Sequence, residues 1–303
     1  MGKKGGIQVE HIVTAQEDGK KLRDILRRSM GVSYSAMKSA KWDNRILLDG
    51  IPATVDTPVR PGQTVTMVLA ENAPVYSLQP YPLPLRIVYE DADFFIIDKP
   101  APLASQSSAM HPDDSLENAL FAHLGCPHKF IYRPVNRLDK GTSGLMAVAR
   151  NPHAQHRLQQ CLHTPDFVRE YLAVVDDTPP EEMGVIDAPI AKENAASIRR
   201  VISPEGKPSR THYQVLHTNG ARALVRLRLD TGRTHQIRVH MAHLGCPVTG
   251  DFLYGRETPL LPGRFALHSA KIDMIHPLTG KHLMLESPLP EELVRLMEAP
   301  LQG

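Results

Sequence analysis

The sequence lacks the features that mark secreted, membrane-spanning or metal-binding proteins. It holds only three cysteines in 303 residues, Cys126, Cys161 and Cys246, and no two of them have CxxC spacing. An odd, scattered set favours neither a disulfide framework nor a zinc site, so we expect a reducing, cytoplasmic location. No run of 18 apolar residues is present, and no apolar stretch follows the first lysines. We therefore expect neither a membrane span nor a secretory signal.

An excess of charge of one sign is also missing. The chain has 35 Lys and Arg against 33 Asp and Glu, a net charge of +2, which by itself argues against a nucleic-acid partner. The charge is unevenly distributed, however. Residues 19–70 hold nine basic and four acidic residues (+5), residues 192–240 hold ten and three (+7), and residues 71–191 hold nine and sixteen (−7). Two separated basic blocks are compatible with a polyanionic partner such as RNA.

The first part of the chain predicts a small α+β module. Residues 20–30 place Leu22, Ile25, Leu26 and Met30 on one side of a helix, with basic residues outside that stripe. A second helix is expected from Ser33 or Ser35 to Lys41, followed by short strands around turns. We expect this module to span residues 19–70, after a tail over residues 1–18 and before a proline-rich linker over residues 71–84.

Residues 85–303 predict a larger, strand-rich domain. Asn151 is expected to cap one helix and Thr234 another. Strands and helices do not alternate as βαβ units, so we predict the α+β class, with a mixed, largely antiparallel sheet flanked by helices and loops. The expected elements are a hairpin over 87–97, a buried strand over 144–149, a helix over 152–163, a strand over 167–175 and a hairpin over 210–229 that turns at Asn219–Gly220.

The most distinctive segment is RPVNRLDKGTSG, residues 133–144. It places Asp139 between Arg137 and Lys140 among turn-forming residues. A loop carboxylate that nearby cations keep ionised can act as a nucleophile at a sugar or an activated base. The same carboxylate can instead cap the turn through Thr142 and Ser143, and the spacing alone favours this structural role.

The segment RLDKGTSG resembles the catalytic loop of the RluA family of pseudouridine synthases. The resemblance extends over about residues 85–290, and several blocks in order are more specific than one motif. Residues 19–70 are similar to the S4 RNA-binding module, on pattern more than on identity. The other blocks that resemble the RluA family are YED at 89–91, DKP at 98–100, FVREYLAVV at 167–175, TGRTHQIRVH at 231–240, GCPVTGDFLYG at 245–255, LHS at 267–269 and IHP at 275–277.

The resemblance implies an enzyme that isomerises uridine to pseudouridine in RNA without a metal or an organic cofactor. Asp139 would be the nucleophile. Tyr171 would lie against the uracil and serve as the base that removes the C5 proton, and Arg238 would pair with Asp139. The target base would leave its helix, and Arg137 would fill or stabilise the vacated space.

The resemblance also implies further RNA contacts. Asn136, Leu267 and His235 are expected to contact the substrate. Asn136 stands where many family members have His, so we expect altered substrate contacts rather than loss of activity. Arg169 stands where Lys is common, which keeps the charge but changes the geometry. In the S4-like module, the residues expected to contact RNA phosphates are Arg27, Arg28, Lys38, Lys41 and Arg45.

These observations predict a monomeric, two-domain RNA pseudouridine synthase. Ribosomal RNA is the favoured substrate and transfer RNA the alternative. A non-catalytic RNA-binding or assembly factor is a rival that the presence of Asp139, Tyr171 and Arg238 disfavours. A glycoside or nucleoside hydrolase is disfavoured because that chemistry needs a second carboxylate. A zinc site at His235, His240 and His243 is disfavoured because no HExxH motif or cysteine accompanies them.

Overall fold

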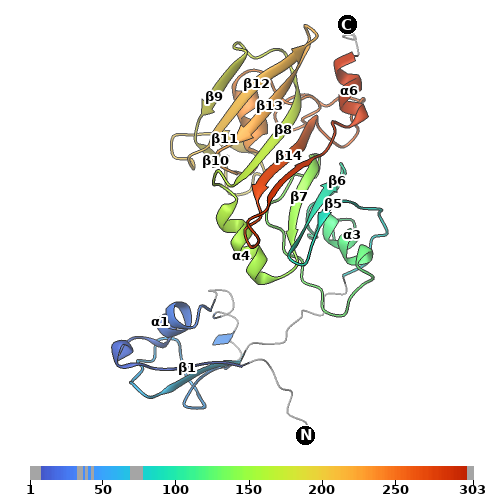
Figure 1. The fold of residues 1–303 in the computed structure, drawn as a ribbon. Coiled ribbons are helices and arrows are strands. Elements are labelled where there is room, and N and C mark those ends of the chain that lie inside the picture. The colour runs from blue at the N-terminus through green and yellow to red at the C-terminus, as the bar shows by residue number, and fades with distance from the viewer. Residues whose placement is uncertain (1–7, 33–36, 38–39, 42–43, 69–77, 299–303) are drawn as a thin grey trace. The chain divides into compact units, whose positions relative to one another are not determined.

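The chain separates into two compact units, one in residues 1–76 and one in residues 77–303. The computed structural model describes residues 8–32, 37, 40–41, 44–68 and 78–298, and Figure 1 shows the elements of both units. Within these residues, no helix is long and apolar enough to cross a lipid bilayer. The division between the units falls inside the linker predicted over residues 71–84.

The described part of the first unit contains a small antiparallel sheet and short helical segments. The sheet has the strand order β1-β4-β2-β3. The predicted helix over residues 20–30 is confirmed: it is built from α1 and η2, a π-helical turn, and its Leu22, Ile25 and Leu26 are buried in the core of the unit. The elements are β1 (Gln8–Ile12), η1 (Ala15–Glu17), α1 (Leu22–Asp24), η2 (Ile25–Ser29), β2 (Ile46–Leu48), β3 (Ile51–Pro52) and β4 (Thr64–Val68).

Two expectations about this unit need revision. The predicted tail over residues 1–18 contains β1, which pairs along its length with β4, and the buried Glu17. The Glu17 carboxylate accepts hydrogen bonds from Thr14 and Ser29, so residues 8–17 are part of the folded unit. Their sequence, QVEHIVTAQE, has too few apolar residues to predict a strand without its partner. Most of the second predicted helix, from Ser33 or Ser35 to Lys41, lies outside the described residues.

The second unit is organised around a nine-stranded sheet. Its strand order is β5-β6-β7-β14-β8-β13-β12-β9, with β15 paired to β14. All neighbours are antiparallel except β7 and β14, which run parallel, so the predicted mixed, largely antiparallel α+β fold is confirmed. The strands are β5 (Arg86–Glu90), β6 (Phe94–Lys99), β7 (Ser143–Ala149), β8 (Phe167–Asp176), β9 (Met183–Asp187), β12 (Arg210–Thr218), β13 (Arg222–Leu229), β14 (Leu267–Ile275) and β15 (His282–Glu286).

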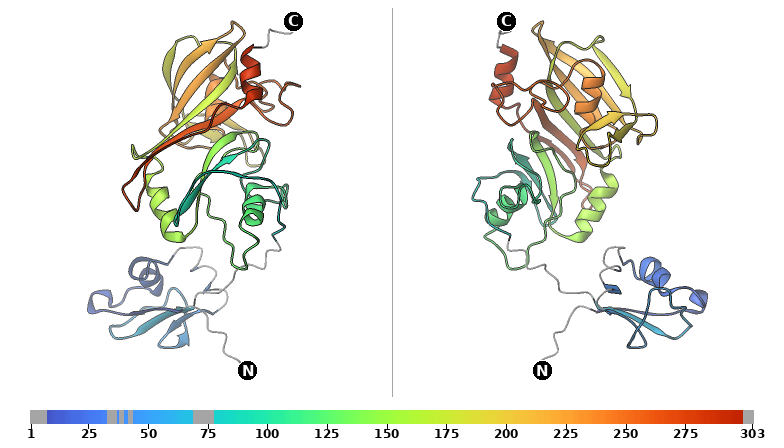
Figure 2. Two further views of the ribbon diagram at one scale, coloured as in Figure 1. Left: turned by 45° about the vertical axis from the view of Figure 1, so that its right-hand side comes forward. Right: turned by 180° about the vertical axis from the view of Figure 1, so that it is seen from behind.

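A few helices and a small hairpin complete this unit. The hairpin β10 (Ile190–Lys192) and β11 (Arg200–Ile202) packs against α5, which also contacts β12. In the rear view of Figure 2, α5 lies in front of the strands of the large sheet. The helices are α3 (Leu116–His123), α4 (Pro152–Cys161), α5 (Gln236–His243) and α6 (Glu291–Glu298).

The local signals for these elements were correct in most places. Asn151 caps α4 by accepting a hydrogen bond from the Ala154 amide, as predicted. Thr234 does not cap α5: the N-cap is His235, which has a left-handed backbone with φ of 58°. The end of the predicted linker also differs, because Tyr81 and Leu83 pack against the core of the second unit.

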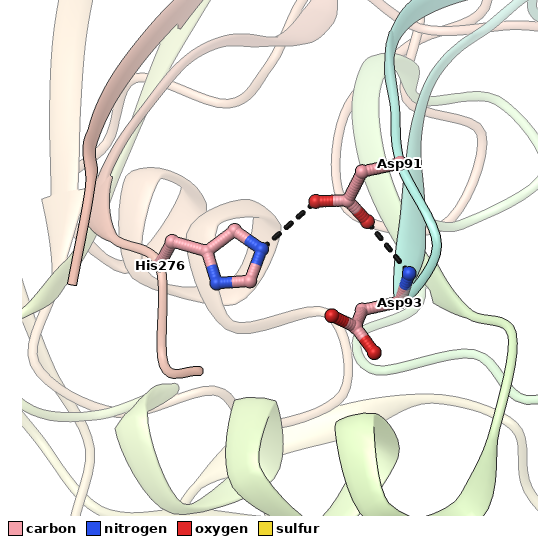
Figure 3. A group of neighbouring side chains, drawn as sticks. All are labelled: Asp91, Asp93 and His276. Carbon is pink, nitrogen blue, oxygen red and sulfur yellow. Dashed lines mark hydrogen bonds and ion pairs between the residues drawn. The ribbon is translucent and has the colours of Figure 1, made fainter. Parts of the chain in front are cut away.

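One hydrogen-bonded group joins the first hairpin of this unit to the end of β14 (Figure 3). His276 Nε2 lies 2.8 Å from Asp91 Oδ2, and Asp91 Oδ1 accepts the Asp93 amide at 2.7 Å. The Tyr89 hydroxyl also donates to Asp91, at 2.6 Å. His276 Nδ1 accepts from two backbone amides, those of Leu278 and Thr279, so Nε2 carries the hydrogen that is donated to Asp91.

These hydrogen bonds explain why the side chains of Asp91, Asp93 and His276 lie close together, although their ligand atoms are also near enough to bind one metal ion. Burial alone would raise the pKa of Asp91, but the hydrogen bonds from Tyr89, two backbone amides and His276 lower it from 3.8 to about 2. The group therefore holds the β5–β6 hairpin to the end of β14, and we call this set of hydrogen bonds the lock.

We predict that Asp91→Asn lowers the free energy of unfolding by about 1–3 kcal/mol at pH 7, because charge-assisted hydrogen bonds are lost. The folded pKa of Asp91 lies below its unfolded value, so its contribution is complete above about pH 4 and is lost as the pH falls through 2. Urea denaturation at several pH values measures both effects. The exposed Asp113→Asn is the control, and an Asp91→Asn effect independent of pH would contradict the lock.

Candidate active site

A small cavity lies where the loop that carries Asp139 meets β8, β14 and the start of α5. Its volume is about 70 Å³, and it adjoins a wider groove of about 640 Å³ that shares Arg137, Asp139, Tyr171 and His235 with it. Residues that are far apart in the sequence therefore form one concave site. The lining of the small cavity is Arg137, Leu138, Asp139, Thr142, Tyr171, Leu229, Arg233, His235, Gln236, Ile237, Arg238 and Leu267.

The loop of residues 137–144 is held in place mainly through its backbone. The Ser105 hydroxyl donates to the Leu138 carbonyl at 2.5 Å and accepts the Leu138 amide at 3.1 Å. The Leu103 amide donates to the Lys140 carbonyl at 3.0 Å. Gly144 has φ of 104°, and a Cβ there would lie 2.2 Å from the Ser269 carbonyl oxygen, so only glycine fits.

A fully buried lysine supports this loop from behind. Lys99 Nζ donates to the carbonyls of Leu103, at 2.8 Å, and Pro100, at 3.1 Å. Burial lowers the pKa of Lys99 to about 7, although the negative charge of Asp139 acts in the opposite direction. Lys99, in the DKP turn at residues 98–100, thus holds the segment up to Leu103, and the Leu103 amide holds the Asp139 loop through Lys140.

Arg238 is the electrostatic centre of the site. Its Nη1 donates to Asp139 Oδ2 at 2.9 Å, while its Nε and Nη2 form a two-pronged ion pair with Asp251 at 2.6 and 2.8 Å. The Arg238 side chain is 3% exposed and that of Asp251 is fully buried, whereas Asp139 is 29% exposed. Arg238 therefore presents Asp139 to the cavity from a buried support.

Aromatic rings enclose this guanidinium group. The Phe265 ring lies 4.1 Å from the Arg238 guanidinium carbon and the Tyr254 ring 5.1 Å from it. Burial alone would lower the pKa of Arg238, but the hydrogen bonds and charges of Asp251 and Asp139 raise it. The Arg238 guanidinium group therefore stays charged and keeps one orientation.

His235 and the apolar walls complete the cavity. His235 Nε2 lies 3.9 Å from Asp139 Oδ2, and its Nδ1 lies 2.9 Å from the Tyr254 hydroxyl. Burial lowers the pKa of His235 more than the charge of Asp139 raises it. Tyr171, on β8, is 5% exposed, and Leu267 lies at the start of β14. A flat, partly apolar ring can be held between these side chains and Asp139.

The other residues singled out from the sequence are placed differently. Arg137 is exposed at the rim of the cavity. Asn136 lines only the wider groove: its Oδ1 accepts the Ala147 amide at 2.9 Å, and its Nδ2 has no partner among the described residues. In the first unit, Arg27, Arg28 and Lys41 are exposed and Arg45 donates to the Val68 carbonyl at 3.1 Å, while Lys38 lies outside the described residues.

Sequence reasoning missed the residues that act on the site from behind. Asp251 and Tyr254 lie within the GCPVTGDFLYG block, but nothing in that block shows that Asp251 meets Arg238. Lys99 lies within the DKP block, but nothing in that block shows that it supports the Asp139 loop, and Ser105 and Phe265 gave no signal. Of the histidines for which a zinc site was disfavoured, His240 is buried, and its ring nitrogens lie 2.8 Å from Thr211 Oγ1 and 2.9 Å from the Ala188 carbonyl oxygen.

Comparison with known proteins identifies the family. A family model for RNA pseudouridylate synthase matches residues 93–243. Ribosomal large subunit pseudouridine synthase D of Escherichia coli (strain K12) is 35% identical over 312 residues, which cover 96% of this chain and 94% of the relative. The chain belongs to the RNA pseudouridylate synthase family. It is therefore an isomerase that acts on RNA, and the resemblance to the RluA family is confirmed.

Other members support the same assignment. An uncharacterized RNA pseudouridine synthase of Bacillus subtilis (strain 168), YlyB, is 35% identical over 294 residues, covering 94% of this chain and 96% of the relative. The solved structure of human RNA pseudouridylate synthase domain containing 1 has a TM-score of 0.57 and 25% identity, and the match covers 72% of this chain and 96% of that one. Members of the family thus share this fold.

We predict that Asp251→Asn lowers kcat by about 100-fold with little change in KM, because an amide cannot hold both nitrogens of Arg238 and the guanidinium shifts away from Asp139. Tritium release from RNA labelled with [5-³H]uridine measures this split. Asp230→Asn, which removes an exposed contact with His212, is the matched control. An unchanged kcat, in a protein with a wild-type far-ultraviolet spectrum, would show that Asp251 does not position Arg238.

Proposed function

We propose that this chain converts uridine to pseudouridine in ribosomal RNA, with Asp139 as the nucleophile. The observation that supports this most is the Asp139 carboxylate held by Arg238 at the mouth of a cavity walled by Tyr171 and Leu267. Ribosomal RNA is favoured over transfer RNA because relatives 35% and 36% identical to this chain are named ribosomal large subunit pseudouridine synthase D.

The two oxygens of Asp139 have different surroundings. Oδ2 accepts the hydrogen bond from Arg238, and the described residues offer Oδ1 no partner. Oδ1 therefore keeps its lone pairs for attack at the sugar C1′ or at the uracil ring, while the hydrogen bond from Arg238 orients the carboxylate. Either route breaks the N1–C1′ bond and lets the uracil turn within the cavity. A C5–C1′ bond then forms, the C5 proton leaves, and N1 gains a proton.

Tyr171 is placed to act on the turned base. Its side chain comes from the face of β8 that lines the cavity, and no hydrogen bond within the described residues occupies its hydroxyl group. We assign it contact with the uracil and removal of the C5 proton. Because a paired uridine cannot reach so small a cavity, the base has to leave its helix, and the exposed Arg137 at the rim fills or stabilises the vacated space.

We predict that Asp139→Asn abolishes tritium release from [5-³H]uridine-labelled ribosomal RNA, a loss of at least about 10⁴-fold, because an amide is not a nucleophile here. RNA affinity, measured by fluorescence anisotropy, should stay within about threefold of wild type. Turnover by Asp139→Asn would refute its role as nucleophile. Tritium release from transfer RNA alone would show that transfer RNA is the substrate. No tritium release by the wild-type protein from any RNA would favour a non-catalytic RNA-binding factor.

We further propose that the first unit is an S4-like RNA-binding module. Its support is the pattern of residues 19–70 and the exposure of Arg27, Arg28 and Lys41. Such side chains contact phosphates and release counter-ions when RNA binds.

The triple variant Arg27→Gln, Arg28→Gln, Lys41→Gln should reduce the slope of log K against log salt concentration by about 2, since each phosphate contact contributes about 0.7–0.9. RNA titrations between 50 and 200 mM salt measure the slope. The variant that replaces Lys20, Arg60 and Arg86 with Gln tests whether the loss of any three exposed positive charges lowers the slope equally. Equal slopes for wild type and the first triple variant would remove this surface from RNA binding.

We also infer a monomer that works in the cytoplasm. The three cysteines are free, one exposed, one partly buried and one buried, as suits a reducing compartment. One chain supplies every residue of the cavity, so the proposed chemistry needs no second copy.

A further inference from the structure

Arg169 is a buried cation that has no counter-ion in the part of the chain that the structure describes. On β8, the side chains of Phe167, Arg169, Tyr171 and Ala173 alternate onto the buried face, and Arg169 is only 7% exposed. No carboxylate lies within ion-pair distance of Arg169 and no acceptor takes a hydrogen bond from it, among the residues that the structure describes. A charge in such a position is unfavourable unless solvent or an anion compensates it.

The wider groove gives this guanidinium group access to a ligand. Arg169 lines the groove of about 640 Å³ beside Gly232, His163 and Arg233. The missing side chain at Gly232 keeps this corner open, because a Cβ there would lie 3.0 Å from His163 Cε1 and 3.8 Å from Arg169 Nη2. The Arg169 side chain therefore borders the open volume of the wider groove.

The corner is also electrostatically positive. Asp139 is the one acidic residue in the described lining of the groove, and its Oδ2 is already paired with Arg238. Burial lowers the pKa of His163, and the charges of Arg169 and Arg233 lower it further. No carboxylate of the described lining lies within ion-pair distance of Arg169, and an anion that enters this corner meets both Arg169 and Arg233.

Accordingly, we propose that Arg169, with Arg233 at the rim, binds one backbone phosphate next to the flipped uridine and so sets how deeply that nucleoside enters the cavity. This inference rests on the proposed function. Arg169 lies two residues from Tyr171 on the same face of β8, about 7 Å along the strand, so a phosphate adjacent to a uracil at Tyr171 is within reach. The planar fork of an arginine holds two phosphate oxygens in a fixed geometry, whereas a lysine ammonium acts as a point charge.

The test uses RNA in which one phosphate is neutral. A synthetic stem-loop with a single loop uridine is made with ordinary phosphates, or with a methylphosphonate on the 5′ or the 3′ side of that uridine. Affinity is measured with full-length protein carrying Asp139→Asn, so that binding is read whether or not the chemistry proceeds. To this background we add Arg169→Gln, Arg169→Lys or, as the matched control on the opposite face of the sheet, Arg226→Gln.

We expect one of the two methylphosphonates to weaken binding by about 10-fold in the parent protein, the effect of one charge-assisted contact. Arg169→Gln should weaken binding to ordinary RNA by a similar factor and lose its sensitivity to that methylphosphonate. Arg169→Lys should keep part of both effects, and Arg226→Gln should behave like the parent.

Two results would overturn the proposal. One is a parent protein insensitive to both methylphosphonates. The other is an Arg169→Gln protein, or an Arg169→Lys protein if the first does not fold, that is as sensitive to them as the parent. Failure of the proposed function is distinguishable, because it appears as absent tritium release by protein with an intact Asp139, whatever the binding data show.

Discussion

The site depends on one arginine held between two carboxylates. Arg238 uses two nitrogens for the buried Asp251 and a third for Asp139, and no other side chain type offers three donors in such a fixed plane. A buried guanidinium group without Asp251 would be strongly destabilised, whereas with it the cation is permanent and oriented. The partly exposed Asp139 is thereby held by a charge-assisted hydrogen bond at the edge of the cavity.

The surrounding fold serves to bring these groups together. Asp139 comes from a loop before β7, Arg238 from α5, and Asp251 from the segment between α5 and β14. The DKP turn and Ser105 fix the loop through its backbone, and no residue that the structure describes hydrogen-bonds to Oδ1 of Asp139. Tyr171 and Arg169 project from one face of β8, which on the proposed function places a surface for the base and a cation for its phosphate side by side.

Most elements of this fold could be predicted from local patterns, because hairpins, caps and alternating strands leave their signals within short segments. Thr234 failed as a cap because Gln236 instead accepts the Arg233 amide and His235 adopts a left-handed backbone. Asp139, Tyr171 and Arg238 came from the family resemblance, since spacing alone favoured structural roles. The roles of Asp251 and Phe265, and the lack of an ion-pair partner for Arg169 among the described residues, could not be predicted, because they depend on contacts between distant segments.

A double-mutant cycle on tritium release tests the central claim most directly. Single-turnover rates are measured for wild type, Asp251→Asn, Arg238→Lys and the double variant. If Asp251 acts only through Arg238, the double variant should be about as slow as Arg238→Lys alone, so that the coupling energy nearly equals the cost of Asp251→Asn. Losses that multiply in the double variant would show that the two residues act independently and would contradict the account.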